Sequence, residues 1–411
     1  MIKTGGGAPI QLFNKMPKQA IVAKETIELP KMQSSFADEH KRKALDIFKS
    51  IPMPKEKDED WRYTNIDKLK LESFEPFESN GRISAALSED LAEKGVILTD
   101  INTAFEEYPK AREYFFKDAK IGNDKFAALS AAYFGNGIFL YVPKNVEIEE
   151  PIKLNFNFDG KCSILHNIIV VESNSKVDFI EEYSNQETEE EQLNVCITEV
   201  FANADSKINF YHVDNWTKNA YNFTNIVGTL ERNAAINWIS GCFGGKLNKL
   251  RIDTNFNGQG SQCNNIGIFL GKGKEHIDFT TNMYHNTENT TNDVLVDGIL
   301  KDESSSVYRG LIKIEKKAQK TNSYLANHIL KLGEKTLANS IPSLKIDAND
   351  VKASHGATVG QINEEHLFYL MARGLSREEA ERLIVEGFFE PVIQKIPLEE
   401  LREKIRGMVR G

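Results

Sequence analysis

The chain has 411 residues and 40% hydrophobic content, so it can bury a sizeable core, and its length allows two or three domains. Its net charge of -9 argues against a nucleic-acid-binding protein, which needs clustered basic residues to displace the counterions of the phosphate backbone. Its apolar runs are much shorter than the roughly 18 residues of a membrane-spanning helix, so we expect no membrane contact.

The N-terminus and the cysteines indicate a cytoplasmic protein. Residues 1–19 contain lysines but lack the apolar stretch of a secretory signal. The cysteines form no C-x-x-C pair, and each lies in or beside a strand-like segment. Zinc sites and ferredoxin-type clusters need closely spaced thiolates, so small buried side chains are the simpler interpretation. We therefore expect reduced thiols at Cys162, Cys196, Cys242 and Cys263.

The first third of the chain is predicted to be a helical domain, residues 1–134, without a catalytic group of residues. The sequence EDWRYTNIDKL at residues 59–69 contains Trp61 and Tyr63. Such an aromatic cluster is either a ligand-binding site or, more commonly, a packing anchor. Apolar residues at helical spacing and local start and stop signals predict helices over residues 36–50, 84–94, 99–116 and 125–133.

After Gly137 the pattern changes to the alternation of β-strands, and a short phrase recurs. It appears as SNSKVDF ending at Phe179, ADSKINF ending at Phe210 and RNAAINW ending at Trp238, at steps of 31 and 28 residues. A related phrase, GKEHIDF, ends at Phe279. This period without helical filler predicts a solenoid, or β-helix, over residues 135–352. A jelly roll or sandwich is also built from many short strands and stays open as an alternative.

A β-helix can also be an enzyme. Polysaccharide lyases and hydrolases with this architecture use clustered carboxylates together with an Arg or Lys on one face. The candidate residues here occupy turn-like positions, where Asp is favoured for local backbone reasons. A β-helical polysaccharide lyase or hydrolase is therefore the alternative function, with Asp293, Asp297, Asp302 and Arg309 as its candidates.

The C-terminal part, residues 353–411, is predicted to be a second helical domain. Alternation over residues 342–352 predicts the last strands, and residues 353–358 predict a glycine-containing turn that holds His355 at the end of the sheet. Two well-capped amphipathic helices follow. They carry more apolar residues than one buried face needs, so they either pack onto the chain or offer a surface to a partner. These residues are Leu367, Phe368, Leu370, Leu383, Ile384, Phe388 and Phe389.

The stretch NDVKASHGATVGQINEEHLFYLMARGLSREEAERLIVEGFFEPV, residues 349–392, resembles the SufB/SufD family of scaffold proteins for iron–sulfur cluster assembly. The sequence EDWRYTNIDKL and residues 292–345 resemble it too. SufB-type chains carry a cysteine where this chain has Thr336, and Glu-His-Glu where it has Ser354-His355-Gly356, so the resemblance is to the SufD branch. Many chains of that branch have a cysteine at the place of Ala353 and a second histidine near Asn289, which this chain lacks.

The resemblance implies a mainly β fold, a right-handed parallel β-helix flanked by N-terminal and C-terminal helical domains. It implies a non-catalytic subunit that pairs with a SufB-like scaffold through the β-helix and with a SufC-like ABC ATPase through the C-terminal helices. It implies that His355 binds transient iron or a nascent iron–sulfur cluster shared with the partner chain, with no permanently bound cofactor. Without its partners, the chain is expected to be able to form a homodimer. The sequence contains no G-x-x-x-x-G-K-[ST] loop for ATP.

Overall fold

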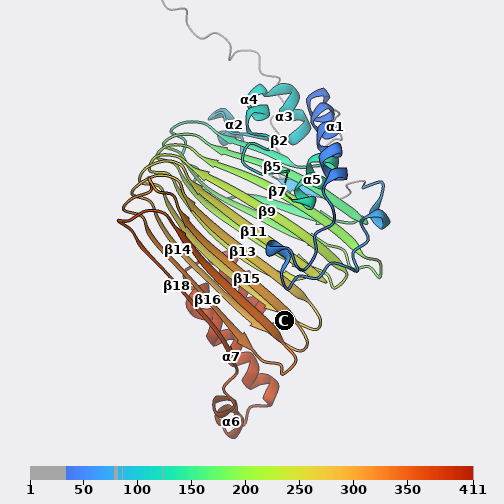
Figure 1. Cartoon of the computed structure of the whole chain (residues 1–411), viewed down its shortest axis with the longest axis vertical. Coiled ribbons are helices and arrows are strands. Elements are labelled where there is room, and N and C mark those ends of the chain that lie inside the picture. Colours follow the sequence, from blue (N-terminus) through green and yellow to red (C-terminus); the bar gives the residue numbers. More distant parts are fainter. Residues whose placement is uncertain (1–33, 78–81, 86, 123, 411) are drawn as a thin grey trace, which may run out of the picture.

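The computed structural model describes residues 34–77, 82–85, 87–122 and 124–410, which form a two-sheet β-solenoid with helices at both ends (Figure 1). The prediction of a mainly β fold built on a parallel β-helix is confirmed, and the jelly-roll alternative is wrong. Each circuit of the chain adds one strand to each sheet, and we call such a pair of strands a rung. The N-terminal residues in which we expect no secretory signal lie outside the described part.

Each sheet contains nine strands. Sheet A has, in spatial order, β1 (Arg82–Ala85), β4 (Ile152–Phe158), β6 (Lys176–Asn185), β8 (Lys207–Trp216), β10 (Ala235–Gly244), β12 (Gln262–Gly271), β14 (Thr291–Leu300), β16 (Asn322–Lys331) and β18 (Lys352–Gln361). Sheet B has β2 (Ile97–Asp100), β3 (Ile138–Val142), β5 (Cys162–Val171), β7 (Gln192–Ala202), β9 (Ala220–Leu230), β11 (Leu247–Phe256), β13 (His276–His285), β15 (Ser305–Ile314) and β17 (Leu337–Ile346).

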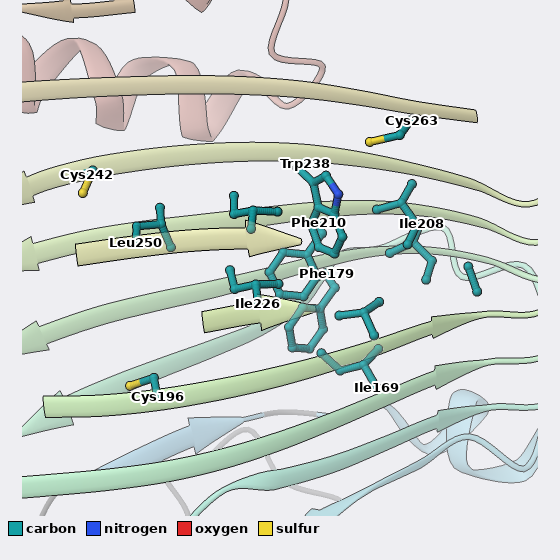
Figure 2. Close-up of a cluster of buried hydrophobic side chains, with 14 of the residues drawn as sticks. Ile169, Phe179, Cys196, Ile208, Phe210, Ile226, Trp238, Cys242, Leu250 and Cys263 are labelled. Atoms are coloured by element: carbon teal, nitrogen blue, oxygen red, sulfur yellow. The ribbon is translucent and has the colours of Figure 1, made fainter. Parts of the chain in front are cut away.

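The register of the strands explains the repeat in the sequence. Phe179, Phe210 and Trp238 are partners in β6, β8 and β10, and their side chains stack in the core (Figure 2). Their ring centroids are 5.2 and 5.1 Å apart. Phe279 does not continue this stack, because it lies on β13 in sheet B. The same alternating phrase therefore serves both sheets, since either sheet sends every second side chain into the shared core.

The turns from sheet B to sheet A also repeat. Each of these turns from β3–β4 to β15–β16 has a residue with positive φ, a backbone conformation that Asn, Asp and Gly tolerate best, whereas residues 347–351 between β17 and β18 have none. Asn289, near which the resemblance implies a second histidine in many related chains, is one of these residues. The turn therefore explains why this chain has an Asn there. Lys320 is the exception in residue type, with φ 59°. The set is Asn145, Asn174, Asp205, Asn233, Gly260, Asn289 and Lys320.

The N-terminal helices pack on the outer face of sheet B, except α2 (Glu89–Glu93), whose Leu91 and Ala92 pack against the core of the solenoid. The predictions for residues 36–50 and 125–133 are confirmed, but the helix predicted over 84–94 is wrong at its start. Residues 82–85 form β1, because they pair with β4 and bury Ile83 in the core, and this tertiary pairing overrides the local pattern. The helices are α1 (Ser35–Ser50), η1 (Glu59–Trp61), η2 (Leu71–Phe74), α2 (Glu89–Glu93), α3 (Ile101–Glu107), α4 (Pro109–Tyr114) and α5 (Lys125–Tyr133).

Three helices follow the last strand: α6 (Glu364–Ala372), α7 (Arg377–Ile393) and α8 (Glu399–Arg410). The second half of α7 and all of α8 pack on the outer face of sheet A, whereas α6 stands beyond the end of the solenoid (Figure 1). None of the helices in the described ranges is long and apolar enough to cross a membrane. The division into domains at residues 134 and 352 stays a prediction.

The four cysteines are buried free thiols, as the sequence predicted. Burial raises the pKa of Cys162 and Cys263 to about 12, and raises that of Cys196 and Cys242 well above its usual value. Cys196, Cys242 and Cys263 point into the core of the solenoid (Figure 2), and Cys162 packs between sheet B and the N-terminal helices. Because the thiolate is the reactive form, such cysteines act as small apolar side chains.

Candidate functional site

The solenoid is open at its C-terminal end. Among the described strands, β18 pairs with β16 alone and β17 with β15 alone, so each is the edge of its sheet. Each residue of these two strands is exposed or half-buried. The rung formed by β17 and β18 therefore presents a core face and two rows of backbone groups without a neighbouring strand, which is a ready-made surface for another chain.

His355 lies on this open rung. The sequence predicted a turn for residues 353–358, but the structure places them in β18. His355 pairs in register with Leu325 of β16, a fully buried core residue. Register partners in a parallel pair point to the same side of the sheet, so the imidazole lies on the core side. It is exposed because no further rung covers it in the described chain. A neutral imidazole there can bind a metal ion.

A polar contact next to His355 joins the two sheets. Ser340 of β17 donates a hydrogen bond to the side-chain oxygen of Asn327 in β16, at 2.7 Å. The amide nitrogen of Asn327 donates to the carbonyl of Val296, at 2.8 Å. Asn327 pairs with Ala357, two residues along β18 from His355. Sequence analysis missed this pair; the only local signal is an Asn at a core position of a strand.

The two positions at which the family resemblance implies cysteines offer no thiolate ligand here. Thr336 is buried and donates its hydroxyl to the carbonyl of Gly333 at 2.7 Å. Ala353 is half-buried and packs against the core of the solenoid. In the described ranges, no three His, Cys, Asp or Glu side chains lie close enough to hold a metal ion. Within the described residues, His355 can therefore supply one ligand of a metal site but not a complete set.

The helical hairpin α6–α7 begins directly after β18. The side chain of Asn363 caps α6, and Ser376 and Glu379 form a capping box for α7, as predicted. The seven apolar residues proposed for a partner surface have different environments. Phe368 and Leu383 are exposed by 73% and 47%, and Leu370, Ile384 and Phe388 are half-buried, whereas Leu367 and Phe389 are core residues of this chain. Tyr369 and Met371, which the sequence analysis did not select, are exposed as well.

The residues considered for a polysaccharide lyase do not form one site. Asp293 and Asp297 lie on β14 in sheet A, whereas Arg309 lies on β15 in sheet B. Asp297 pairs with His328 at 2.8 Å. Asp302 occupies a turn at φ 57°, where its carboxylate accepts a hydrogen bond from the backbone of Gly273. The geometry therefore gives the lyase alternative no catalytic cluster.

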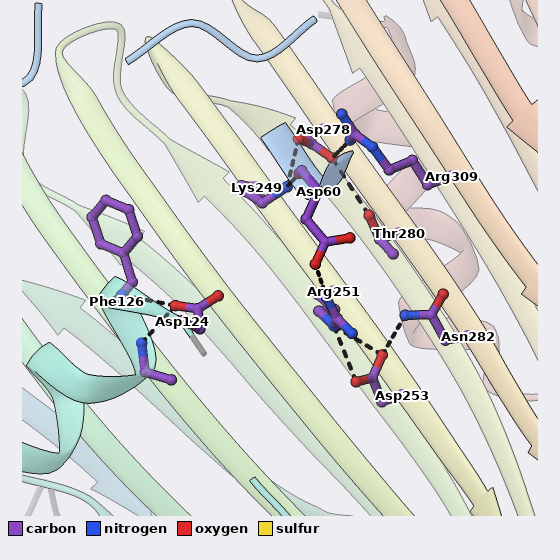
Figure 3. A network of polar contacts seen from close by, with 11 residues as sticks. Asp60, Asp124, Phe126, Lys249, Arg251, Asp253, Asp278, Thr280, Asn282 and Arg309 are labelled. Carbon is purple, nitrogen blue, oxygen red and sulfur yellow. Dashed lines mark hydrogen bonds and ion pairs between the residues drawn. The ribbon is translucent and has the colours of Figure 1, made fainter. Parts of the chain in front are cut away.

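A polar network away from the open end holds residues 59–69, which we call the N-terminal strap. The fully buried Asp278 accepts hydrogen bonds from Lys249 and Arg309, both at 2.6 Å (Figure 3), and from Thr64 of the strap at 2.5 Å. Arg309 also donates to the backbone carbonyl of Arg62. Burial alone would raise the pKa of Asp278, but the two cations hold it below its usual value. Three successive rungs thus bind the strap.

The aromatic residue of the strap is a packing anchor. Trp61 is buried, and its ring lies 5.5 Å from Phe126 and 6.0 Å from Phe223. The packing interpretation of this cluster is therefore confirmed. Tyr63, by contrast, is exposed, with φ 66°.

A cavity of about 740 Å³ lies between the strap and sheet B, but several of its charged groups have structural partners. Asp124 accepts hydrogen bonds from the first backbone N–H groups of α5, and Asp253 accepts two from Arg251 (Figure 3). Arg251 also pairs with Asp60 of the strap, at 3.3 Å. These contacts attach the strap to the sheet, so the open end remains the candidate site.

Comparisons with known proteins agree with this geometry. Residues 155–388 match the family model for the SufBD core domain of SUF-system FeS cluster assembly, and residues 70–154 match the SufBD N-terminal region. The chain is 31% identical to the iron–sulfur cluster assembly protein SufD of Bacillus subtilis, over 91% of this chain and 95% of that protein. It is 30% identical to an iron–sulfur cluster assembly SufBD family protein of Staphylococcus epidermidis, over 76% of this chain and 68% of the relative. The chain therefore belongs to the SufBD family of iron–sulfur cluster assembly proteins.

Proposed function

We propose that this protein is a non-catalytic scaffold subunit on which an iron–sulfur cluster is built, with His355 as its own ligand. One observation carries the proposal: His355 is on the core side of the last rung and is uncovered. Iron and the nascent cluster are the cargo of such a site. A single imidazole completed by ligands from another chain holds its cargo weakly enough to release it.

The partner that completes the site is a SufB-like scaffold chain. It docks on the open rung of β17 and β18, where edge strands offer unpaired backbone groups and the core face offers half-buried apolar side chains such as Leu344. The same surface supports a homodimer when the partner is absent. Iron reaches the site at this junction, so iron acquisition also depends on the paired chains.

A SufC-like ABC ATPase binds the α6–α7 hairpin. Phe368, Tyr369, Met371 and Leu383 are exposed apolar side chains within this one short element. A cluster of this kind fits a groove on a partner protein better than it fits solvent. ATP use by the partner then supplies the movement that opens or closes the cluster site.

The ligand role is tested with His355→Ala in cells that depend on this assembly system. The expected result is unchanged unfolding of the purified chain and loss of activity of cluster-dependent enzymes, because the variant removes a ligand and no buried contact. His40→Ala, which removes a half-buried histidine of α1 outside the open rung and the hairpin, is the control. Normal enzyme activity with His355→Ala would refute the proposal.

The ATPase surface is tested with Phe368→Asp and Leu383→Asp by co-purification. A charge placed in an apolar interface is costly, so both variants are expected to lose the ATPase. Tyr63→Asp, an exposed aromatic residue on the strap, is the control and should retain it. Unchanged co-purification of the two hairpin variants would show that the ATPase binds elsewhere.

A further inference from the structure

Helix α7 belongs to two different cores along its length. Ile384 packs with Leu367 and Ala380 in a small core made mostly by the hairpin, to which Ile362 and Leu332 at the end of the solenoid also contribute. One residue later, Val385 and then Phe389 join the cluster that fixes α7 and α8 to the outer face of sheet A. The helix thus starts in one packed body and ends in another. A movement between the two bodies must bend α7 close to this point.

The sequence places two helix-weakening residues just after that boundary. Pro391 lies inside α7 and has no backbone N–H, so the carbonyl of Gly387, four residues before it, loses its helical hydrogen bond. Gly387 is itself a poor helix former. A Cβ atom at Gly387 would meet no described heavy atom within 4 Å, and its φ is not positive. Neither packing nor backbone conformation therefore explains the glycine.

Both residues lie on the exposed side of α7, where two ion pairs from α8 close over the same segment. Arg410 lies 3.4 Å from Glu386, and Arg406 lies 2.5 Å from Glu390. Glu386, Glu390 and Arg406 are half-buried, and Arg406 holds Glu390 through two hydrogen bonds. These pairs hold one position of the helix and must break when α7 bends.

The other end of the hairpin is attached directly to the candidate site. β18 ends at Gln361, and α6 begins at Glu364, so only two residues separate the helix from the strand that carries His355. Gly360, at the end of β18, has open space around its Cβ position as well. Because β18 has a single neighbouring strand in the described chain, a pull on α6 acts on an edge that little else restrains.

We propose that α7 is hinged over residues 385–391, with Gly387 and Pro391 as the joint. The hairpin turns about this joint while α8 stays on sheet A, and its movement is passed through residues 360–363 to β18 and His355. The proposal rests on the proposed function for the force, which the bound ATPase would supply. It makes α7 the element that sets whether the cluster site is open.

The hinge is tested directly by spin labels on the full chain. Labels on Glu378→Cys in α7 and Lys317→Cys in a solenoid turn can be placed selectively, because both positions are exposed and the four native cysteines are buried. The distance between the two labels is expected to have a broad distribution. The hinge variant, which combines Gly387→Ala and Pro391→Ala, should narrow this distribution by restoring a regular helix. Gly407 in α8 also has open space around its Cβ position, so Gly407→Ala is the matched control and should leave the distance distribution unchanged. A single narrow distance in the parent chain, or an identical distribution in the hinge variant, would overturn the hinge.

The consequence is tested in cells. The hinge variant should still co-purify with the ATPase but lose cluster-dependent enzyme activity several-fold, whereas Gly407→Ala should be normal. Full activity of the hinge variant, in cells where His355→Ala is inactive, would refute the hinge and leave the scaffold proposal intact. Full activity of His355→Ala would instead refute the scaffold proposal, whatever the distance distribution shows.

Discussion

Two parts of the same solenoid differ in how deeply their side chains are buried. In β5 and β7, the residues on both faces of each strand are buried, because neighbouring rungs, the shared core and the N-terminal helices cover them. In β17 and β18, which repeat the same strand geometry, each residue is exposed or half-buried. The comparison teaches that burial in a solenoid comes from neighbours, so the last rung keeps its core-facing residues available to another chain.

The polar residues on the core side follow the same division. His212, in β8, lies 2.7 Å from Glu181 and 3.1 Å from Asp214, and all three side chains are fully buried. His355, on the last rung, faces solvent. An inner histidine is therefore part of the architecture, whereas the histidine at the end is free for chemistry.

The largest difference between the two parts should appear when an aromatic ring is removed from the inner stack. Phe210→Ala is expected to lower the free energy of unfolding by about 3–5 kcal/mol, because it leaves a cavity between Phe179 and Trp238. Leu337→Ala, at a 66% exposed position of β17, should cost about 0.5 kcal/mol or less. Urea denaturation measures both, and similar losses would contradict the comparison.

Removal of a buried charge should lower the free energy of unfolding nearly as much. Asp278→Asn leaves Lys249 and Arg309 without their carboxylate, so we expect a loss of about 3 kcal/mol in urea denaturation. Asp293→Asn, at an exposed position of β14, is the control and should change stability by about 0.5 kcal/mol at most. If Asp278→Asn were equally mild, the strap would not depend on this network.

The buried His212 should make the stability of the inner solenoid depend on pH, which His355 should not do. Burial alone would lower the pKa of His212, but the carboxylates of Asp214 and Glu181 raise it to about 10. A histidine with a raised pKa in the folded state stabilises fully below its unfolded pKa of about 6.5 and loses this contribution as pH rises toward 10. We expect the parent chain to lose on the order of 2 kcal/mol between pH 7 and 9. His212→Gln should lack this slope and His355→Gln should keep it, when unfolding is followed across pH; equal slopes in all three would refute the assignment.

The smallest effect concerns the turn before the last rungs. Lys320 adopts a left-handed conformation, which costs a lysine about 1 kcal/mol more than a residue suited to it. Lys320→Asn should therefore raise the free energy of unfolding by roughly 0.5–1 kcal/mol. Lys317→Asn, in the same turn but without positive φ, should have no measurable effect in the same denaturation experiment. Equal effects would mean that the turn is not strained.

The repeat of the strands could be predicted from the sequence. Features that depend on contacts between residues distant in the sequence could not. Phe179, Phe210 and Trp238 revealed the period because equivalent residues stack rung on rung. The sheet to which Phe279 belongs could not be predicted, since the same alternation serves both sheets. Residues 353–358 contain a glycine and little apolar alternation, so they indicated a turn; pairing with β16 makes them part of a strand.

The candidate site shows the same limit. His355 was predicted, because its surroundings resemble a known family, but its direction toward the core follows only from its partner Leu325. Asn327 and Ser340 were missed, because the hydrogen bond between them joins residues on different sheets and no local motif marks it. Among the apolar hairpin residues, periodicity could not separate the buried Leu367 from the exposed Phe368, which depends on how α6 meets α7.

The clamp on the N-terminal strap has a consequence for the time course of synthesis. Thr64 and Asp278 are 214 residues apart, and Arg62 and Arg309 are 247 apart. The strap is made early by the ribosome, yet its binding groove does not exist until β15 has been translated. Contacts at such separations are slow to form and are found last. In nascent chains, Arg62 and Thr64 therefore lack their final partners through most of translation, and this interval is when a chaperone would be needed most.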